Sequence, residues 1–423
     1  MQSQQYLAGL MQAKRRNLER MVEKVPDTDW QVLQNFISHS PWDAQSLTKQ
    51  MATAANAAIG GDADSCLLLD ESGFSKKGQH SVGVSRQYNG RLGKVDHCQV
   101  AVFAALCRRK RVTLIDTRLY LPENWTTAKD RCRAAGVPAT RQKFQKKAEL
   151  ALEMVQQARE NGVVFEWVGG DAFYGDDPTL LRQLDQQGEM FMLDVHQDQR
   201  VYLEDPQPYI PKRQGRFGRH PRRYHTDHPA VEVRTWAAEQ PQGAWHKIGL
   251  RSRTNGDHHA HVLHRLVWLW DGLEAQAHQW HLLVTRTPSS PGKLKYSLSN
   301  APLDTPLPRL VFMQGQRYWI ERALEDAKSE LGMADYQVRG WTAWHHHMAL
   351  VLLAQLFCLE IRLKYKTDHP LLSCHDVREV LAFLLPQRQT TVEEVLRQLL
   401  FRHQQRADSI KYYLKKQLLN KSD

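Results

Sequence analysis

A short apolar run that ends in an acidic residue constrains this chain more than any other feature. Residues 66–69 are a cysteine and three leucines, Asp70 follows them directly, and Ser72 and Gly73 then break the apolar pattern. A continuous apolar run of this length, bounded by a glycine, predicts a short strand that is buried on both faces. A carboxylate at the end of such a strand loses hydration and needs a partner, which can be a metal ion shared with other carboxylates. An acid that only caps a turn is the alternative for a single strand of this kind.

A second strand of the same design weakens that alternative. Residues 163–168 are mostly apolar, Gly169 and Gly170 follow them, and the run ends at Asp171. Glycines allow a backbone or a ligand to approach closely. Two strands that each run into an aspartate predict a pair of carboxylates that converge on one point.

A third acid lies on a predicted helix over residues 317–328. Glu321 comes four residues after Arg317 and seven residues before Lys328. On an α-helix these spacings place the three charged side chains along one face. Ion pairs between residues four apart are also common on solvated helix surfaces, so the helix alone leaves a functional site and a surface face both open.

Together, these residues give the chain a resemblance to a known family. Two strand-end aspartates and a helical glutamate, flanked by this arginine and this lysine, resemble the DDE transposases of bacterial insertion sequences, in particular the group with a Tyr-Arg-Glu-Lys signature on the glutamate helix. The tracts at residues 70–78, 330–333 and 336–341 resemble the same group, and the resemblance covers roughly residues 65–360. Gln314 stands three residues before Arg317, where the signature has a tyrosine, and the role of this position stays open.

The resemblance implies a transposase that cuts the ends of an insertion sequence and joins them to target DNA. Asp70, Asp171 and Glu321 would be the catalytic carboxylates and would hold two Mg²⁺ ions, for which Mn²⁺ could substitute. Arg317 and Lys328 would contact backbone phosphates. The partners would be double-stranded DNA, both transposon ends and target, and a second copy of the chain in a homodimer on DNA. A nuclease without strand transfer and a non-catalytic DNA-binding repressor are the alternatives.

Two further acids compete with these assignments. Glu325 lies one turn beyond Glu321 on the same predicted helix, but only Glu321 has the signature spacing to both Arg317 and Lys328. Glu71 follows Asp70 directly, and strand alternation predicts that it points to the opposite face. We therefore prefer Asp70 and Glu321.

The same resemblance implies an α/β fold, with a ribonuclease H-like core and a mixed sheet, interrupted by a β-rich insertion and flanked by N- and C-terminal helical regions. The residue patterns agree, because three strands, a helix, a strand, a helix and a strand are predicted in this order before residue 196. The expected domains are residues 1–60, a helical DNA-end-binding domain; 61–196, the first part of the catalytic core; 197–316, the insertion; 317–364, the rest of the core with the glutamate helix; and 365–423, a C-terminal helical region.

The net charge of the chain favours a polyanionic partner. Its 57 Lys and Arg residues outnumber its 46 Asp and Glu residues, which gives a net charge of +11. Arg15 and Arg16, on the predicted first helix, and Lys76 and Lys77, after the first strand, are expected to contact DNA. A solvated helix face explains the first group equally well. The lysine-rich C-terminal tail could contact DNA or a second subunit.

The insertion carries two tryptophans on a predicted strand over residues 261–270. Trp268 and Trp270 are two residues apart and would share one face of the strand. They could pack in the core of a small sheet, or one could stack on a base that is flipped out of the DNA end. Asn255 and Gly256 predict a hairpin turn before this strand, which favours a structured insertion.

Histidine and cysteine spacing gives no support to a zinc site. His258, His259, His261 and His264, and the run at residues 345–347, lack cysteine partners, so phosphate contacts or helix packing explain them better. The six cysteines include no Cys-x-x-Cys pair and fit a reducing compartment. The N-terminus lacks the layout of a signal peptide, and the most apolar stretch, residues 348–359, is too short to cross a bilayer. We therefore expect a cytoplasmic protein that does not associate with a membrane, and the resemblance implies a bacterial protein that associates with the nucleoid.

Overall fold

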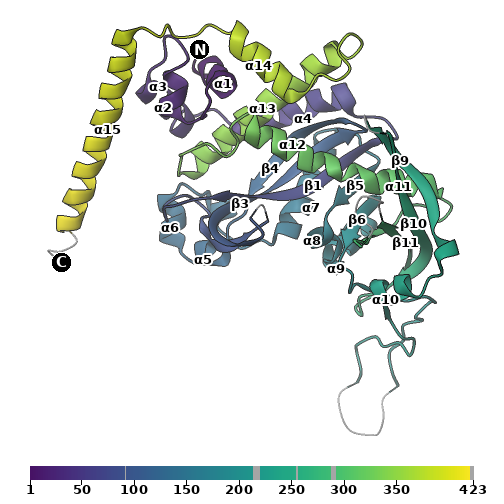
Figure 1. Cartoon of the computed structure of the whole chain (residues 1–423). Helices are drawn as coiled ribbons and strands as arrows, with labels where there is room; N and C mark the ends of the chain where they lie inside the picture. Colours follow the sequence, from purple (N-terminus) through teal and green to yellow (C-terminus); the bar gives the residue numbers. More distant parts are fainter. Residues whose placement is uncertain (91, 213–219, 254–255, 287–291, 420–423) are drawn as a thin grey trace.

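One large mixed sheet organises the computed structural model of the chain, which describes residues 1–90, 92–212, 220–253, 256–286 and 292–419 (Figure 1). The sheet has ten strands. Nine of them follow one path in the order β2-β3-β1-β5-β6-β12-β11-β10-β9, and β4 pairs with β3. Helices lie above and below the sheet in Figure 1, and α15 projects from the body on the left.

The first half of this sheet has the strand arrangement of a ribonuclease H-like core. The central strand β1 pairs antiparallel with β3 and parallel with β5, and β5 pairs parallel with β6. On the other side, β3 pairs antiparallel with both β2 and β4. The predicted fold class is therefore confirmed. The strands are β1 (Ser65–Ser75), β2 (Ser85–Asn89), β3 (Lys94–Arg108), β4 (Arg111–Leu119), β5 (Trp167–Gly170) and β6 (Phe191–Val195).

β1 is longer than the sequence predicts. Its leucines Leu67, Leu68 and Leu69 are fully buried, as expected for a central strand. Ser72 and Gly73 do not end the strand, however, because both continue to pair with β3. Pairing with β5 stops at Leu69. Asp70 therefore emerges where β1 and β5 part, in the middle of β1 and not at its end.

Helices cover both faces of this half of the sheet. One group packs on β1, β3, β4, β5 and β6 from above in Figure 1, and a second group packs from below. The upper helices are α4 (Ala44–Ile59), α11 (Leu307–Gln316), α12 (Tyr318–Ser329) and α13 (Trp341–Lys364). The lower helices are α7 (Lys147–Glu160), α8 (Ala172–Gly175) and α9 (Pro178–Gln186), and the short helices α5 (Glu123–Thr126) and α6 (Lys129–Ala134) follow β4.

The β-rich insertion extends the same sheet and does not form a separate one. β12 (Lys295–Ser299) pairs antiparallel with β6, and β11 (His278–Arg286), β10 (Gly256–Leu269) and β9 (His246–Arg253) follow in turn. β10, β11, β12 and α10 (Val233–Ala238) share a second hydrophobic cluster. β7 (Arg200–Val201) and β8 (Val231–Glu232) form a small sheet of their own. β9 and β10 pair as a hairpin, and Asn255 of the predicted turn lies outside the described residues.

The N-terminal helices pack into the main core. Tyr6 of α1 (Gln2–Gln12) and Ile37 of α3 (Trp30–Ser38) belong to the same hydrophobic cluster as β1 and α13. α2 (Leu18–Val22) lies between these two helices in the chain. Because α1 ends at Gln12, the prediction that residues 14–16 lie on the first helix is wrong, and these residues form the connection from α1 to α2.

α13 is the central buried helix of the protein. α13 has 24 residues, and its most apolar window has a mean hydropathy of 1.4, so it is long and apolar enough to cross a membrane. However, 67% of that window is buried inside the protein. α13 contacts α3, α4, α12 and β4, as expected for a core helix. α14 (Cys374–Leu384) follows it. The C-terminal helical region continues with one long helix, α15 (Val392–Leu419).

Candidate active site

The three predicted carboxylates line one hollow where β1, β5 and α12 meet. Its volume is about 1080 Å³. Arg317 and Lys328 line the same hollow. The structure therefore brings together all five signature positions, although Asp70 and Glu321 are 251 residues apart in the chain. We call this space the carboxylate hollow, and its charged lining residues are Asp70, Glu71, Lys147, Asp171, Arg317, Glu321, Glu325, Lys328 and Asp335.

Asp70 is placed in the hollow by the point at which β1 loses its neighbour. Its Oδ1 accepts a hydrogen bond from the Glu71 N–H at 2.7 Å. Burial, together with the nearby charges of Asp171 and Glu321, raises the pKa of Asp70 to about 7, although this hydrogen bond and Arg317 oppose the shift. The ionised form is therefore costly here and would gain from a cation.

Asp171 caps the N-terminus of α8 directly after β5. Its Oδ1 accepts from the Phe173 N–H at 3.1 Å. Two glycines bring this aspartate close to β1: a Cβ on Gly169 would lie 2.7 Å from the Leu68 side chain, and one on Gly170 would lie 3.0 Å from a side-chain methyl of the next strand. Burial raises the pKa of Asp171, and Arg317 only partly offsets this effect.

Glu321 lies in the first turn of α12 and is held by Arg317. The Arg317 Nη2 lies 2.6 Å from Glu321 Oε1, and its Nε lies 2.8 Å from Asp194 Oδ2. Burial acts to lower the pKa of Arg317, but the surrounding carboxylates of Asp194, Glu321, Asp70 and Asp171 outweigh burial, so the pKa is raised. One guanidinium thus serves as the internal cation for several carboxylates.

Sequence reasoning missed a buried polar group behind Arg317. Asp194 of β6 accepts a hydrogen bond from Ser297 Oγ at 2.6 Å and pairs with Lys295 Nζ at 3.1 Å. Gln314 Nε2 donates to the same Ser297 Oγ at 2.8 Å. A signal for Asp194 was present, because residues 191–193 are an apolar run that leads directly to an acid, as in β1. Gln314 thus occupies the tyrosine position of the signature as a buried hydrogen-bond donor.

The two rival acids have partners of their own. Glu71 pairs with Lys147 of α7, and it lines the hollow together with Asp70. Glu325 also lines the hollow, but its carboxylate is exposed and pairs with Arg322 at 2.9 Å.

The donor chemistry of the hollow fits a hard divalent cation. No ion pair in the described part of the chain includes Asp70 or Asp171, and burial raises the pKa of both. Carboxylate oxygens are the ligands that Mg²⁺ and Mn²⁺ prefer. Within the described residues no three acidic, histidine or cysteine side chains already converge as a metal-ligand set. Glu321 would have to turn from Arg317 to complete the set.

The predicted DNA-contacting residues divide into buried and exposed positions. Arg16 is 8% exposed, and its guanidinium donates to the carbonyls of Leu10 and Ser329, so it is a structural residue. Lys76 donates to the Tyr336 carbonyl at 3.2 Å, and burial lowers its pKa to about 8.

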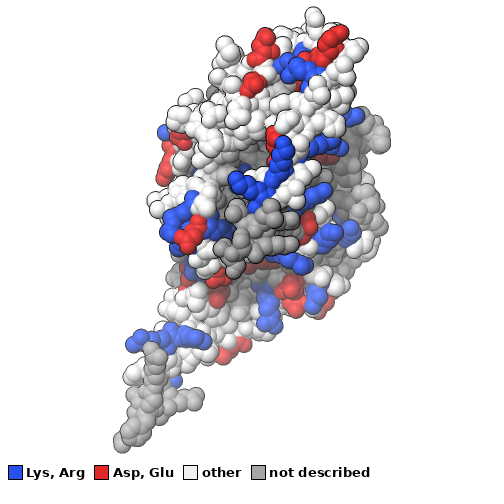
Figure 2. Space-filling view, turned by 90° about the vertical axis from the view of Figure 1, so that its left-hand side faces the viewer, with Lys and Arg blue, Asp and Glu red and all other residues white. Residues whose placement is uncertain are grey.

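Arg15 and Lys77, in contrast, are exposed. Lys77 lines a groove of about 1160 Å³ between the N-terminal helices and the core, together with Arg339. This groove adjoins the carboxylate hollow, because Ala334 lines both. Figure 2 looks at the protein from the side on which α6 and α15 lie in Figure 1, and Lys and Arg side chains gather across the middle of that face.

The tryptophan pair lies away from the carboxylate hollow. Trp268 and Trp270 are both half-buried, and neither lines the hollow. β10 ends at Leu269, so Trp270 follows the strand, and its Nε1 donates to the Glu274 carbonyl at 2.8 Å. The structure therefore does not bring either indole to the predicted catalytic residues.

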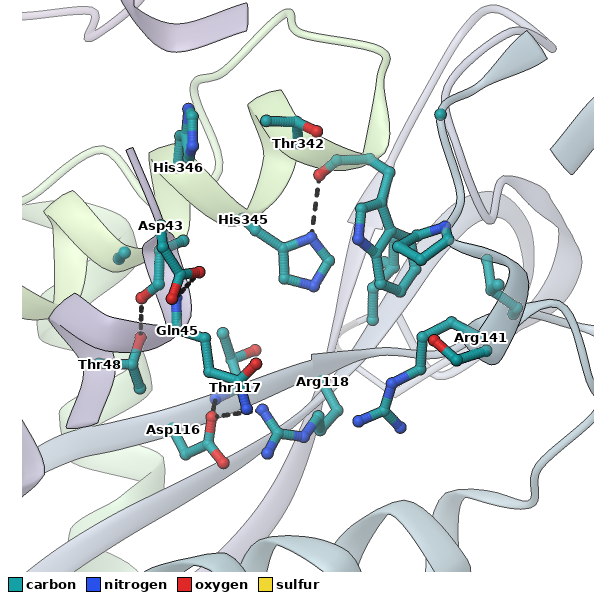
Figure 3. A pocket seen from close by; sticks show the side chains of 18 of the residues that line it. Asp43, Gln45, Thr48, Asp116, Thr117, Arg118, Arg141, Thr342, His345 and His346 are labelled. Atoms are coloured by element: carbon teal, nitrogen blue, oxygen red, sulfur yellow. Dashed lines mark hydrogen bonds and ion pairs between the residues drawn. The ribbon is translucent and has the colours of Figure 1, made fainter. Parts of the chain in front are cut away.

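The histidine run at the start of α13 contributes to helix packing beside a different cavity (Figure 3). His346 bonds to the carbonyls of Ile37 and Trp42, at 3.0 and 2.8 Å, and His347 bonds to the Tyr6 hydroxyl at 2.8 Å. His345 Nδ1 lies 2.9 Å from the Trp341 carbonyl, and its ring points into a cavity of about 470 Å³. Asp116, Arg118 and Arg141 also line this cavity, which we call the α13 cavity. It contains none of the signature residues.

Comparisons with known proteins identify the family of the chain. A family profile described as DDE superfamily endonuclease matches residues 1–257. The chain is 23% identical over 328 residues to a protein of Microchaete diplosiphon named as a probable transposase for insertion sequence element IS701, and the match covers 77% of this chain and 73% of that protein. The crystal structure of the NurA nuclease from Sulfolobus solfataricus aligns with 82% of this chain and all of that one at 10% identity. Its TM-score of 0.21 is too low to carry an argument about the fold. The profile match spans more than half of the sequence, and the chain belongs to the DDE superfamily of endonucleases.

Proposed function

We propose that this protein is a transposase that cleaves double-stranded DNA at the ends of an insertion sequence and joins those ends to target DNA. One observation carries the proposal: Asp70, Asp171 and Glu321 share a hollow with Arg317 and Lys328, and the pKa values of both aspartates are raised. Buried carboxylates that lack ion-pair partners of their own are typical of a site that binds a cation during its function.

The residues of the hollow would have separate roles. Asp70, Asp171 and Glu321 would hold Mg²⁺, which when bound supplies activation of a water or 3′-hydroxyl and stabilisation of the leaving oxygen. Arg317 and Lys328 would contact the phosphates on either side of the cleaved bond. Lys77 and Arg339 would hold the DNA that leads along the adjoining groove. A second copy of the chain would bind the other end of the element.

An assay with the element's own ends tests the proposal. Duplex oligonucleotides that carry the terminal sequence are incubated with the protein, a supercoiled target plasmid and Mg²⁺, and products are resolved on denaturing gels. A transposase gives cut ends and ends joined to the plasmid. Cleavage without joined products would indicate a nuclease without strand transfer, and binding without cleavage would indicate a repressor. Either of these results would contradict the proposal.

A role for Trp268 or Trp270 in opening the DNA end stays a prediction. Stacking on an unpaired base typically contributes about 1–3 kcal/mol. Loss of cleavage in Trp268→Ala or Trp270→Ala at an unchanged melting temperature would support stacking. A melting temperature that falls by several degrees, with normal cleavage below it, would leave only the packing role that the Trp270–Glu274 hydrogen bond favours.

A further inference from the structure

Asp194 is a buried carboxylate beside the hollow whose role is not explained by metal binding. It is 9% exposed and does not line the carboxylate hollow. Its Oδ1 accepts from Ser297, and its Oδ2 lies 2.8 Å from Arg317 Nε and 3.1 Å from Lys295 Nζ. Both oxygens are therefore engaged by groups of the protein itself.

Arg317 has two carboxylate partners, and they come from different elements. Glu321 lies in α12, four residues after Arg317, which precedes that helix, whereas Asp194 lies in the sheet. Glu321 is the partner that a metal ion must recruit, because its side chain is 47% exposed and lines the hollow. If Asp194 were absent, Arg317 would have Glu321 as its only direct partner and would compete with the metal for that carboxylate.

We propose that Asp194 is a positioning residue that retains Arg317 while Glu321 turns to a metal ion, so that the arginine stays beside the site without occupying it. The inference rests on the proposed function. It assigns to the buried acid of β6 the task of separating two cations, the guanidinium and the metal, that would otherwise share the same carboxylate.

The insertion contributes residues that hold Asp194 in place. Lys295 and Ser297, which hold Asp194, both lie in β12, the strand that joins the insertion to the core sheet. Gln314 extends the group by its hydrogen bond to Ser297. The insertion is thereby coupled to the position of Arg317 through contacts of 2.6 to 3.1 Å.

The test measures metal binding without turnover. The full-length protein, free of DNA, is titrated with Mg²⁺ while its melting temperature is followed, and the midpoint of the stabilisation is recorded. Asp194→Asn should raise that midpoint by about 10- to 100-fold, the range typical when a residue that orients a metal ligand is lost. The matched control is Asp326→Asn, because Asp326 is also buried and pairs with an arginine of α12, Arg322 at 2.9 Å, but lies outside the hollow. Its midpoint should stay within about twofold of that of the unmodified protein.

A double variant distinguishes positioning from a general structural defect. In Asp194→Asn with Arg317→Met, the competing guanidinium is gone, so the Mg²⁺ midpoint should return to near its original value while cleavage stays absent. If Asp194→Asn folds poorly because Lys295 loses its counter-ion, Asp194→Asn with Lys295→Met removes both charges and should show the same raised midpoint. An unchanged Mg²⁺ midpoint in both Asp194→Asn and Asp194→Asn with Lys295→Met would overturn the proposal. A midpoint that does not recover in Asp194→Asn with Arg317→Met would also overturn it. If Asp70→Asn and Asp171→Asn also leave the Mg²⁺ response unchanged, the proposed metal site itself has failed.

Discussion

The carboxylate hollow and the α13 cavity both place buried acids beside arginines, but they balance their charges differently. In the α13 cavity, Asp116 pairs with Arg118 at 2.9 Å, and Arg141 pairs with Glu153 at 2.8 Å, so each arginine has its own acid. In the carboxylate hollow, Arg317 is shared, and no ion pair of the described residues includes Asp70 or Asp171.

The difference separates packing from function. A set of charges that is balanced within the protein has little to gain from a ligand, and removing one member leaves an uncompensated charge. A set with surplus negative charge is held at a cost in stability and gains when a cation arrives. By this criterion we propose the carboxylate hollow as the functional site, although the α13 cavity also contains histidines and arginines.

Loss of the surplus carboxylates should have the largest effect. Asp70→Asn, Asp171→Asn and Glu321→Gln should each lower the cleavage rate by at least about 10³-fold, because in the proposed function these carboxylates would hold the metal ion. Asp116→Asn is the matched control: it should leave cleavage by the folded protein intact and lower the free energy of unfolding by roughly 3 kcal/mol, since Arg118 would stay buried without its acid. Normal cleavage by Glu321→Gln with an inactive Glu325→Gln would move the third ligand to Glu325.

The pKa shifts of Asp70 in the carboxylate hollow and of His345 in the α13 cavity should change stability with pH in opposite directions. For the carboxylate hollow, Asp70 has a pKa of about 7 when folded and an ordinary value near 3.8 when unfolded. Between these values the folded state holds a proton that the unfolded state has lost, so stability falls as pH rises from about 4 to 7. With EDTA present, the free energy of unfolding of Asp70→Asn should fall by roughly 2–4 kcal/mol less over this pH range than that of the unmodified protein. Urea denaturation at several pH values measures it, and equal pH profiles for both proteins would contradict the assignment.

In the α13 cavity, the contribution of His345 to the pH dependence of stability should be smaller than that of Asp70 and of opposite sign. Burial lowers the pKa of His345 to about 4, from an ordinary value of 6.5. The folded state therefore keeps this ring neutral while the unfolded state takes up a proton, and stability is lost as pH falls from about 6.5 to 4. His345→Gln should abolish roughly 1–2 kcal/mol of that acid loss. A loss of the same size in the variant would show that other groups cause it.

The smallest effects are expected for substitutions of single basic residues. Here an exposed cation is compared with a buried one. Lys77 is exposed on the groove, so Lys77→Gln should weaken DNA binding several-fold and reduce the salt dependence by about one phosphate contact. Arg16 is engaged inside the protein, so Arg16→Gln should lower the melting temperature and leave the salt dependence unchanged. Titrations of labelled duplex at several salt concentrations measure both, and a reduced salt slope for Arg16→Gln would assign it to DNA.

Local patterns in the sequence predict the parts of the fold that depend on local physics. The buried run before Asp70 and the glycines before Asp171 follow from periodicity and sterics, and the resemblance singled out Glu321 by its spacing; all three acids line one hollow. The apolar stretch at residues 348–359 lies within the buried helix α13, Trp341–Lys364.

The rest depends on contacts between distant segments. Nothing within residues 295–299 indicates that this strand pairs with β6, and that pairing makes the insertion part of the core sheet. Asp194 had a local signal, yet its partners come from β12 and from the start of α12, so its role could not be derived from spacing. Arg16 looks like a solvated cation in sequence and is buried only because residues 329–335 fold over it.

The order of the strands in the sheet also has a consequence for synthesis on the ribosome. Asp171 and Glu321 are 150 residues apart, and the strands of the insertion must form between them. At about 5–20 residues per second, roughly 8–30 s separate the emergence of the second carboxylate from that of the third. During that interval the nascent chain exposes β6 as an open sheet edge, which β12 later covers. A chain interrupted in this window would carry two acids and an unpaired edge, and it would be prone to aggregation and unable to cut DNA.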